Sequence, residues 1–125
     1  MKYFFEPINL RVWNIFIEIC SFSYEESFYA TKEMEIGDTV FFYVTKKNNR
    51  IPSGIYGNGI ITKPPYTIDN GRYMADVKIK YLRFDEPIIE FDICKRFLTQ
   101  FRSVHRIDND IMVELMKTAL SSIVN

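Results

Sequence analysis

The sequence is poor in the residues that build most catalytic and metal centres. Its 125 residues include two cysteines, one histidine and one tryptophan, and 16 basic side chains balance 16 acidic ones. A single histidine, His105, excludes a site with paired histidine ligands, and the cysteines lack the CxxC spacing of a zinc motif. Cys20 and Cys94 lie beside apolar residues. This predicts reduced, buried thiols in an intracellular protein, with one distant disulfide as the alternative.

Long apolar runs are also missing. The run from Val40 to Val44 is far too short to cross a bilayer. Charge comes early, at Lys2, and no small-residue cleavage site follows, so no signal peptide is expected. Gly57-Asn58-Gly59 matches neither a phosphate-binding loop nor a dinucleotide fingerprint. We therefore expect a cytoplasmic protein without membrane contact, metal or cofactor, and with a binding rather than a catalytic role.

The composition that is present favours one folded domain. Hydrophobic residues make up 47% of the chain and aromatic residues 16%, enough to build a core. A chain of this length holds one such core, so residues 1–125 are expected to form a single domain. The charge is unevenly spread: residues 1–38 hold three basic and seven acidic side chains, and residues 39–125 hold thirteen and nine. The alternatives are a mixed solvated surface and a local basic face on a neutral protein.

Strand patterns dominate the middle of the chain. Gly37-Asp38 is a tight-turn dipeptide before a β-branched and aromatic run, which predicts a buried strand at 39–45. A glycine-rich strand is predicted at 54–62, where glycine marks a bulge, a barrel corner or a close approach to the backbone. Residues 72–83 alternate as a half-exposed antiparallel strand does. Another strand is predicted at 2–6, ended by Pro7, and residues 21–31 fit either a short strand or a loop.

Helical patterns frame these strands. A helix is predicted from Asn9 to about Cys20, and a short helix capped by Asp92 is predicted to turn Ile93, Phe97 and Phe101 inward. A last helix is expected to begin near 108–110, with its apolar positions at helical spacing: Ile111, Met112, Leu115, Met116 and Ala119. The order of elements predicts an α+β domain, a small curved antiparallel sheet or β-barrel flanked by helices.

Three segments together resemble a known family. They are Ile36-Gly-Asp-Thr-Val-Phe-Phe-Tyr-Val-Thr45, Ser53-Gly-Ile-Tyr-Gly-Asn-Gly-Ile-Ile-Thr-Lys-Pro-Pro-Tyr66 and Arg72-Tyr-Met-Ala-Asp-Val-Lys-Ile79. With an aromatic first strand and a helix that carries a tryptophan, they look like an EVE domain of the PUA-like superfamily, which also holds YTH and ASCH domains. The resemblance covers Tyr3 to about Leu120, and the sequence differs most from the family pattern at residues 21–31.

The resemblance implies a binding module. EVE and YTH domains hold a modified base, flipped from its strand, in a pocket on the sheet, and prokaryotic EVE-like domains often serve as readers in modification-dependent restriction systems. It therefore implies modified DNA as the partner, with fusion to or association with a restriction NTPase or nuclease. The alternatives are an RNA-binding PUA-like domain, and a small enzyme or small-molecule nucleotide binder using the same pocket.

On this resemblance, a group of aromatic and hydroxyl side chains is expected to bind the base, with ordinary core or loop packing as the alternative for each. An extruded base needs aromatic faces to replace its lost stacking and polar groups for its edge. Of the two neighbours in the central strand, Tyr43 is favoured over Phe42 as a pocket residue, because a tyrosine hydroxyl needs water or a hydrogen-bond partner. The expected base-binding residues are Trp13, Ser21, Phe22, Ser23, Tyr24, Tyr43 and Tyr66.

A basic rim is expected to hold the flanking phosphates. Three basic residues fall within five positions between the two central strands, at Lys46, Lys47 and Arg50, and Lys63 follows the glycine-rich strand. These four residues are the predicted contacts to the nucleic-acid backbone.

Overall fold

The computed structural model describes residues 1–8, 25–45 and 51–124. Their elements, in chain order, are β1 Tyr3–Ile8, β2 Glu25–Tyr29, β3 Thr39–Val44, β4 Gly54–Ile61, β5 Tyr66–Thr67, β6 Tyr73–Leu82, β7 Ile89–Glu90, α1 Phe91–Phe97, β8 His105–Arg106 and α2 Asp110–Val124. The helix predicted at 9–20 lies outside the described residues, as do Trp13, Ser21, Phe22, Ser23, Tyr24, Lys46, Lys47 and Arg50. No helix in the described part of the chain is long and apolar enough to cross a membrane.

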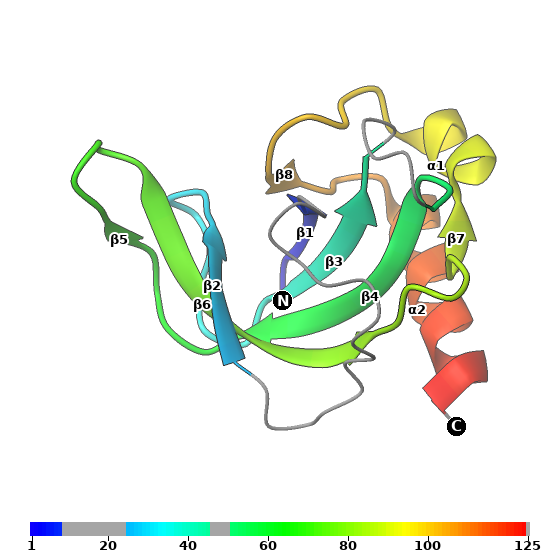
Figure 1. Ribbon diagram of the computed structural model, residues 1–125, viewed down its shortest axis with the longest axis horizontal. Coiled ribbons are helices and arrows are strands. Elements are labelled where there is room, and N and C mark those ends of the chain that lie inside the picture. The colour runs from blue at the N-terminus through cyan, green and yellow to red at the C-terminus, as the bar shows by residue number, and fades with distance from the viewer. Residues whose placement is uncertain (9–24, 46–50, 125) are drawn as a thin grey trace.

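The strands form one curled, mixed sheet. Its order is β2-β6-β4-β3-β1-β8, with β5 added to β6 and β7 to β4. The expectation of a purely antiparallel sheet needs correction, because β1 and β3 run parallel, with Phe4 beside Val40. The chain between these two strands is long enough for the crossover that a parallel pair requires. Figure 1 shows the sheet curling from β8 and β1 through β3 and β4 to β6 and β2, with both helices at the side away from β2.

Central strand β3 is buried on both faces. Val40, Phe42 and Val44 belong to a core inside the curl, whereas Phe41 and Tyr43 belong to a second core beneath the helices. All six residues of β3 are buried. A strand covered on both faces shows a continuous apolar run instead of an alternating one, which explains the pattern seen in the sequence.

Glycines allow the sheet to curl because the neighbouring strand crosses very close to them. A Cβ on Gly57 would lie 2.0 Å from the carbonyl oxygen of Tyr81, and one on Gly59 would lie 2.5 Å from Val77. A shift in register between Asn58 and Gly59 marks a bulge in the same place. The predicted close approach to the backbone is therefore confirmed, and what approaches these glycines is strand β6 of the chain itself.

Strand β1 continues through the proline that was expected to end it. Pro7 pairs in register with Tyr43 on the β3 side, and Ile8 follows it in the strand. On the other side, β8 pairs only with Phe4 and Phe5. A proline fits here because, among the described residues, no strand pairs with Pro7 on that side and so none requires its N–H as a donor.

The two helices bury faces that differ from those predicted. In α1 the buried residue is Cys94, while Ile93 is exposed, because the helix begins at Phe91 and its cap residue is Glu90 rather than Asp92. Phe97 and Phe101 pack against the helix-side core as expected.

In α2, Met112 and Met116 are buried as predicted, with Val113 beside them, whereas Ile111 and Leu115 are exposed. The side-chain oxygen of Asn109 accepts a hydrogen bond from the backbone N–H of Met112 at 3.0 Å, which caps the start of this helix.

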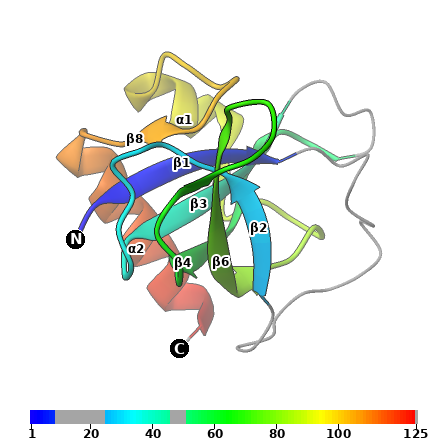
Figure 2. The ribbon, with the colours of Figure 1, turned by 90° about the vertical axis from the view of Figure 1, so that its left-hand side faces the viewer.

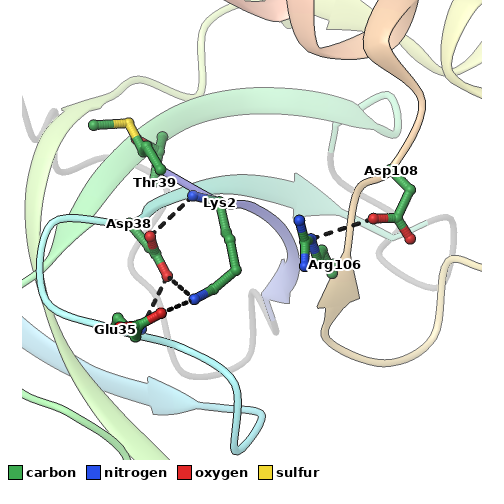
Figure 3. A network of polar contacts seen from close by, with 7 residues as sticks. Lys2, Glu35, Asp38, Thr39, Arg106 and Asp108 are labelled. Carbon is green, nitrogen blue, oxygen red and sulfur yellow. Dashed lines mark hydrogen bonds and ion pairs between the residues drawn. The ribbon is translucent and has the colours of Figure 1, made fainter.

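A buried ionic corner holds the beginnings of β1 and β3 together (Figure 3). Asp38 is 4% exposed, and its carboxylate accepts hydrogen bonds from the backbone N–H groups of Lys2 and Glu35, each at 2.9 Å. The ammonium of Lys2 lies 3.4 Å from the same carboxylate and also pairs with Glu35. The Gly37-Asp38 turn in the sequence is therefore a structural joint between two strands.

Candidate binding pocket

A pocket opens where the two edges of the curled sheet face each other. It has a volume of about 400 Å³, within the usual range for ligand sites. In Figure 2, β1 runs behind β6 and β2. Residues from both sides line the pocket. Three segments line it: the end of β1, the junction of β2 with β6, and the chain before β8. The lining residues are Glu6, Pro7, Tyr29, Ala30, Arg72, Tyr73, Arg102, Ser103 and Val104.

Glu6 is the one fully buried residue among those lining the pocket. It alternates with Phe4 and Ile8, so it lies on the face of β1 that points into the curl. Its side chain is 2% exposed, and Oε1 has no hydrogen-bond partner among the described residues. Burial raises the pKa of this carboxyl well above its usual range. In its uncharged form, which the raised pKa favours, this carboxyl carries one O–H donor and one carbonyl acceptor.

The β2 and β6 wall presents an arginine and two tyrosines. A tight turn leads into β6, in which Gly71 adopts φ +79° and the Asn70 side chain accepts a hydrogen bond from the Arg72 N–H at 3.0 Å. The Arg72 guanidinium then lies 4.9 Å from the centre of the Tyr29 ring, within the range of a cation–π contact. The N–H of Ala30 donates to the Tyr73 carbonyl at 2.9 Å, which ties the end of β2 to the start of β6. The turn therefore fixes Arg72 at the rim.

The third wall is a turn organised by one glutamine. The side-chain oxygen of Gln100 accepts hydrogen bonds from the N–H groups of Arg102 and Ser103, at 2.8 and 2.9 Å. Its amide nitrogen donates to the Ser103 hydroxyl at 2.7 Å. Arg102 is exposed at the pocket. The turn thus places a second guanidinium at the rim, across from the β2 and β6 wall.

The described part of the chain places neither a metal-ligand cluster nor a cysteine at this pocket. The described residues contain no group of three histidine, cysteine or acidic side chains that could hold a metal ion. Cys94 lies in the helix-side core, away from the pocket lining, and burial raises the pKa of its thiol to about 12. The pocket offers a buried carboxyl with a raised pKa inside and two cationic groups at its rim. Such a site fits a planar polar group attached to an anion.

Tyr43 does not line this pocket. It is 1% exposed and packs in the helix-side core, where its ring centre lies 4.8 Å from that of Phe5 and 5.4 Å from that of Phe101. Phe42 is also buried, in the other core. The interpretation that one of these two neighbours is free for a ligand needs correction, because β3 is covered on both faces.

Tyr66 and Lys63 lie together on the outer face of β6. The Tyr66 hydroxyl donates to Asp76 at 2.9 Å, and the Lys63 ammonium lies 3.6 Å from the same carboxylate. Burial works to raise the pKa of Asp76, but hydrogen bonds from Ser27 and Tyr66 and the charge of Lys63 outweigh it and lower that pKa. Tyr66 is 39% exposed. Neither Tyr66 nor Lys63 lines the pocket.

The sequence interpretation missed the pocket's central residues, Glu6, Arg72 and Arg102. One signal was available for Glu6: a single acid stands in an otherwise apolar strand, at a position that alternates with Phe4 and Ile8. The two arginines gave no comparable signal, because they come together only when the sheet curls.

The fold is shared with proteins of known structure. No protein-family model matches the sequence, and no curated protein matches it. A protein of Agrobacterium tumefaciens has a TM-score of 0.68 at 11% identity, over 95% of this chain and 93% of that one. Human THYN1, solved in complex with DNA containing 5-methylcytosine, has a TM-score of 0.60 at 12% identity, over 95% and 98%.

A further similar structure is the N-terminal domain of Thermococcus gammatolerans McrB, solved bound to 5-methylcytosine DNA. It has a TM-score of 0.59 at 16% identity, over 100% of each chain. At these identities the likenesses show the fold. They confirm the α+β architecture that the resemblance to EVE domains predicts, a curled sheet flanked by helices.

Proposed function

We propose that this chain is a binding module for DNA that carries a modified base, and that the base enters the pocket flipped out of its strand. The observation that carries the proposal is the pocket between the sheet edges, with the buried Glu6 carboxyl inside and Arg72 and Arg102 at its rim. Two proteins of similar fold were solved with 5-methylcytosine DNA, which supports modified DNA as the partner.

The physical requirements of base flipping match this pocket. An extruded base loses its stacking and its pairing, so a binding site has to offer planar surfaces and hydrogen-bond partners. Tyr29 and Tyr73 are the aromatic residues of the lining, and Glu6 has free hydrogen-bonding capacity. Arg72 and Arg102 are exposed and cationic, as contacts to the flanking phosphates require.

The base contacts predicted at Trp13, Ser21, Phe22, Ser23 and Tyr24 stay predictions. So do the phosphate contacts at Lys46, Lys47 and Arg50, because all eight residues lie outside the described part of the chain. Replacing the three basic residues by alanine should weaken binding to modified and unmodified DNA alike and flatten the salt dependence. Phe22→Ala should lower affinity for modified DNA by about 1–3 kcal/mol, the worth of one stack.

The test of the pocket is a binding titration with matched duplexes. Oligonucleotides carry one 5-methylcytosine, one 5-hydroxymethylcytosine, one N6-methyladenine or no modification, and binding is followed by fluorescence anisotropy at several salt concentrations. We expect selectivity for one modified duplex. Replacing both Arg72 and Arg102 by alanine should weaken binding to every duplex and reduce the salt slope by about 2. Arg96→Ala is the matched control, since Arg96 is exposed on α1 and does not line the pocket.

Equal affinity of the unchanged protein for modified and unmodified duplexes would contradict the proposal. An unchanged salt slope in the double arginine variant would mean that the nucleic acid does not contact Arg72 and Arg102. Matched RNA oligonucleotides belong in the same titration, because PUA-like resemblance also implies RNA binding, and tighter binding to RNA would favour that alternative. Association with a restriction NTPase or nuclease remains a prediction of the resemblance.

A further inference from the structure

Glu6 differs from ordinary buried acids in having unused hydrogen-bonding capacity at a pocket wall. Its Oε1 atom has no partner among the described residues, and no ion pair there joins it to Arg72 or Arg102. A buried polar group without a partner is costly to the fold. Its position in the lining of a cavity indicates that the missing partner comes from a ligand.

The hydrogen-bonding pattern of an uncharged carboxyl limits which ligand groups can pair with Glu6. It presents an O–H donor and a carbonyl acceptor side by side. Cytosine presents the complementary pair on its edge, because ring nitrogen N3 accepts and the N4 amino group donates. Thymine presents N3–H and the carbonyl O4, and a carbonyl oxygen is a weaker acceptor for an acidic proton than a basic ring nitrogen. An anionic ligand group would leave the carbonyl acceptor of Glu6 unpaired.

We propose that Glu6, in its uncharged form, pairs with the N3 and N4 edge of a cytosine-type base and so sets which base the pocket accepts. The proposal rests on the proposed function, since it assigns the edge that the same pocket recognises. Glu6 would donate its O–H to N3 and accept the N4 hydrogen, and both partners would remain neutral.

Glu6 is the one carboxyl group among the described residues that line the pocket. The other titratable side chains of that lining are Arg72, Arg102, Tyr29 and Tyr73. His105 packs against the Phe5 ring at 5.0 Å, and Phe5 belongs to the helix-side core. His105 therefore lies on the face of β1 opposite to Glu6.

The test compares three proteins and two probes. The probes are duplexes with either 5-methylcytosine or thymine opposite an abasic position, which differ on the target base only at its polar edge. The unchanged protein should bind the 5-methylcytosine probe about 10- to 100-fold more tightly. Glu6→Gln keeps a donor and an acceptor and should retain most of the affinity for the 5-methylcytosine probe, whereas Glu6→Leu should lose most of that affinity and the preference over thymine. Thermal melting checks that each variant is folded.

A pH series separates this role from a merely structural one. Affinity of the unchanged protein for the 5-methylcytosine probe should fall by up to about tenfold per pH unit once the pH exceeds the raised pKa of Glu6. The Glu6→Gln profile should lack that fall. The proposal is overturned if both profiles have the same shape, or if Glu6→Leu keeps the preference for 5-methylcytosine.

These outcomes are distinct from failure of the proposed function. If the unchanged protein binds modified DNA selectively but Glu6→Gln and Glu6→Leu behave alike, only the assignment of the edge fails. If the unchanged protein shows no selectivity in any duplex, the proposed function fails first. If either variant does not fold, the preference of the unchanged protein for 5-methylcytosine over thymine and its pH profile still test the proposal.

Discussion

Two buried carboxyl groups, those of Asp38 and Glu6, lie near the two ends of β1 and differ in their hydrogen bonding. At its beginning, Asp38 accepts two backbone hydrogen bonds and lies beside the Lys2 ammonium. Toward its end, Glu6 is buried just as deeply, yet Oε1 has no partner among the described residues. The first carboxyl holds two strands together, and the second lines a pocket. Burial alone therefore does not distinguish the two acids. Their hydrogen bonds do, since Asp38 is fully engaged in the fold and Oε1 of Glu6 is not.

The largest expected effect concerns the paired acid. Asp38→Ala should lower the free energy of unfolding by about 2–4 kcal/mol, because it leaves buried N–H groups without their acceptor. Urea unfolding measures the change. Asp108→Ala is the control, since the Asp108 side chain is 81% exposed and pairs with Arg106 at the surface, where the expected loss is under about 1 kcal/mol. Equal losses in both variants would contradict the comparison.

The unpaired acid should make stability depend on pH. The pKa of Glu6 is raised in the folded state, so above the ordinary glutamate pKa the unfolded chain releases a proton that the folded chain retains. Stability should then fall as pH rises, by at most about 1.4 kcal/mol per pH unit, until the folded-state pKa is passed. Urea unfolding of Glu6→Gln across the same pH range should lack this slope. A slope of equal size in both proteins would assign it to another group.

A smaller effect is expected at the turn beside Glu6. Gln100→Ala removes three hydrogen bonds that shape the Arg102 turn, and we expect a stability loss of about 1 kcal/mol because these groups are partly solvated. Affinity for the preferred DNA should fall because Arg102 is less well placed. Anisotropy titrations and thermal melting together measure this. Unchanged affinity with lowered stability would show that the turn serves the fold alone.

The smallest effect is expected for the exposed member of the ionic corner. The Glu35 side chain is 75% exposed and pairs with Lys2. Glu35→Gln should change the free energy of unfolding by less than about 1 kcal/mol, since exposed ion pairs contribute little. A loss as large as that of Asp38→Ala would mean that the corner acts as one unit, and would weaken the distinction between buried and exposed partners.

Local pattern in the sequence was enough for the main strands. The apolar run at β3, the alternation in β6 and the glycines of β4 each reflect what a strand needs at its own positions. The phases of the helices were harder to predict. Ile93 and Leu115 fit the apolar face that the sequence predicts, yet both are exposed. The buried face of each helix depends on where the helix begins and on which face of the sheet it packs against.

The sequence by itself determined the strands, the tight turns and the absence of a metal or thiol motif, because these depend on neighbours along the chain. The tertiary structure decided which side chains share the pocket. Glu6, Arg72 and Arg102 lie far apart in the sequence and meet only because glycines let β6 cross close to β4 and curl the sheet. Tyr43 illustrates the same point, since its burial follows from helices packing on a face of β3 that no local pattern specifies.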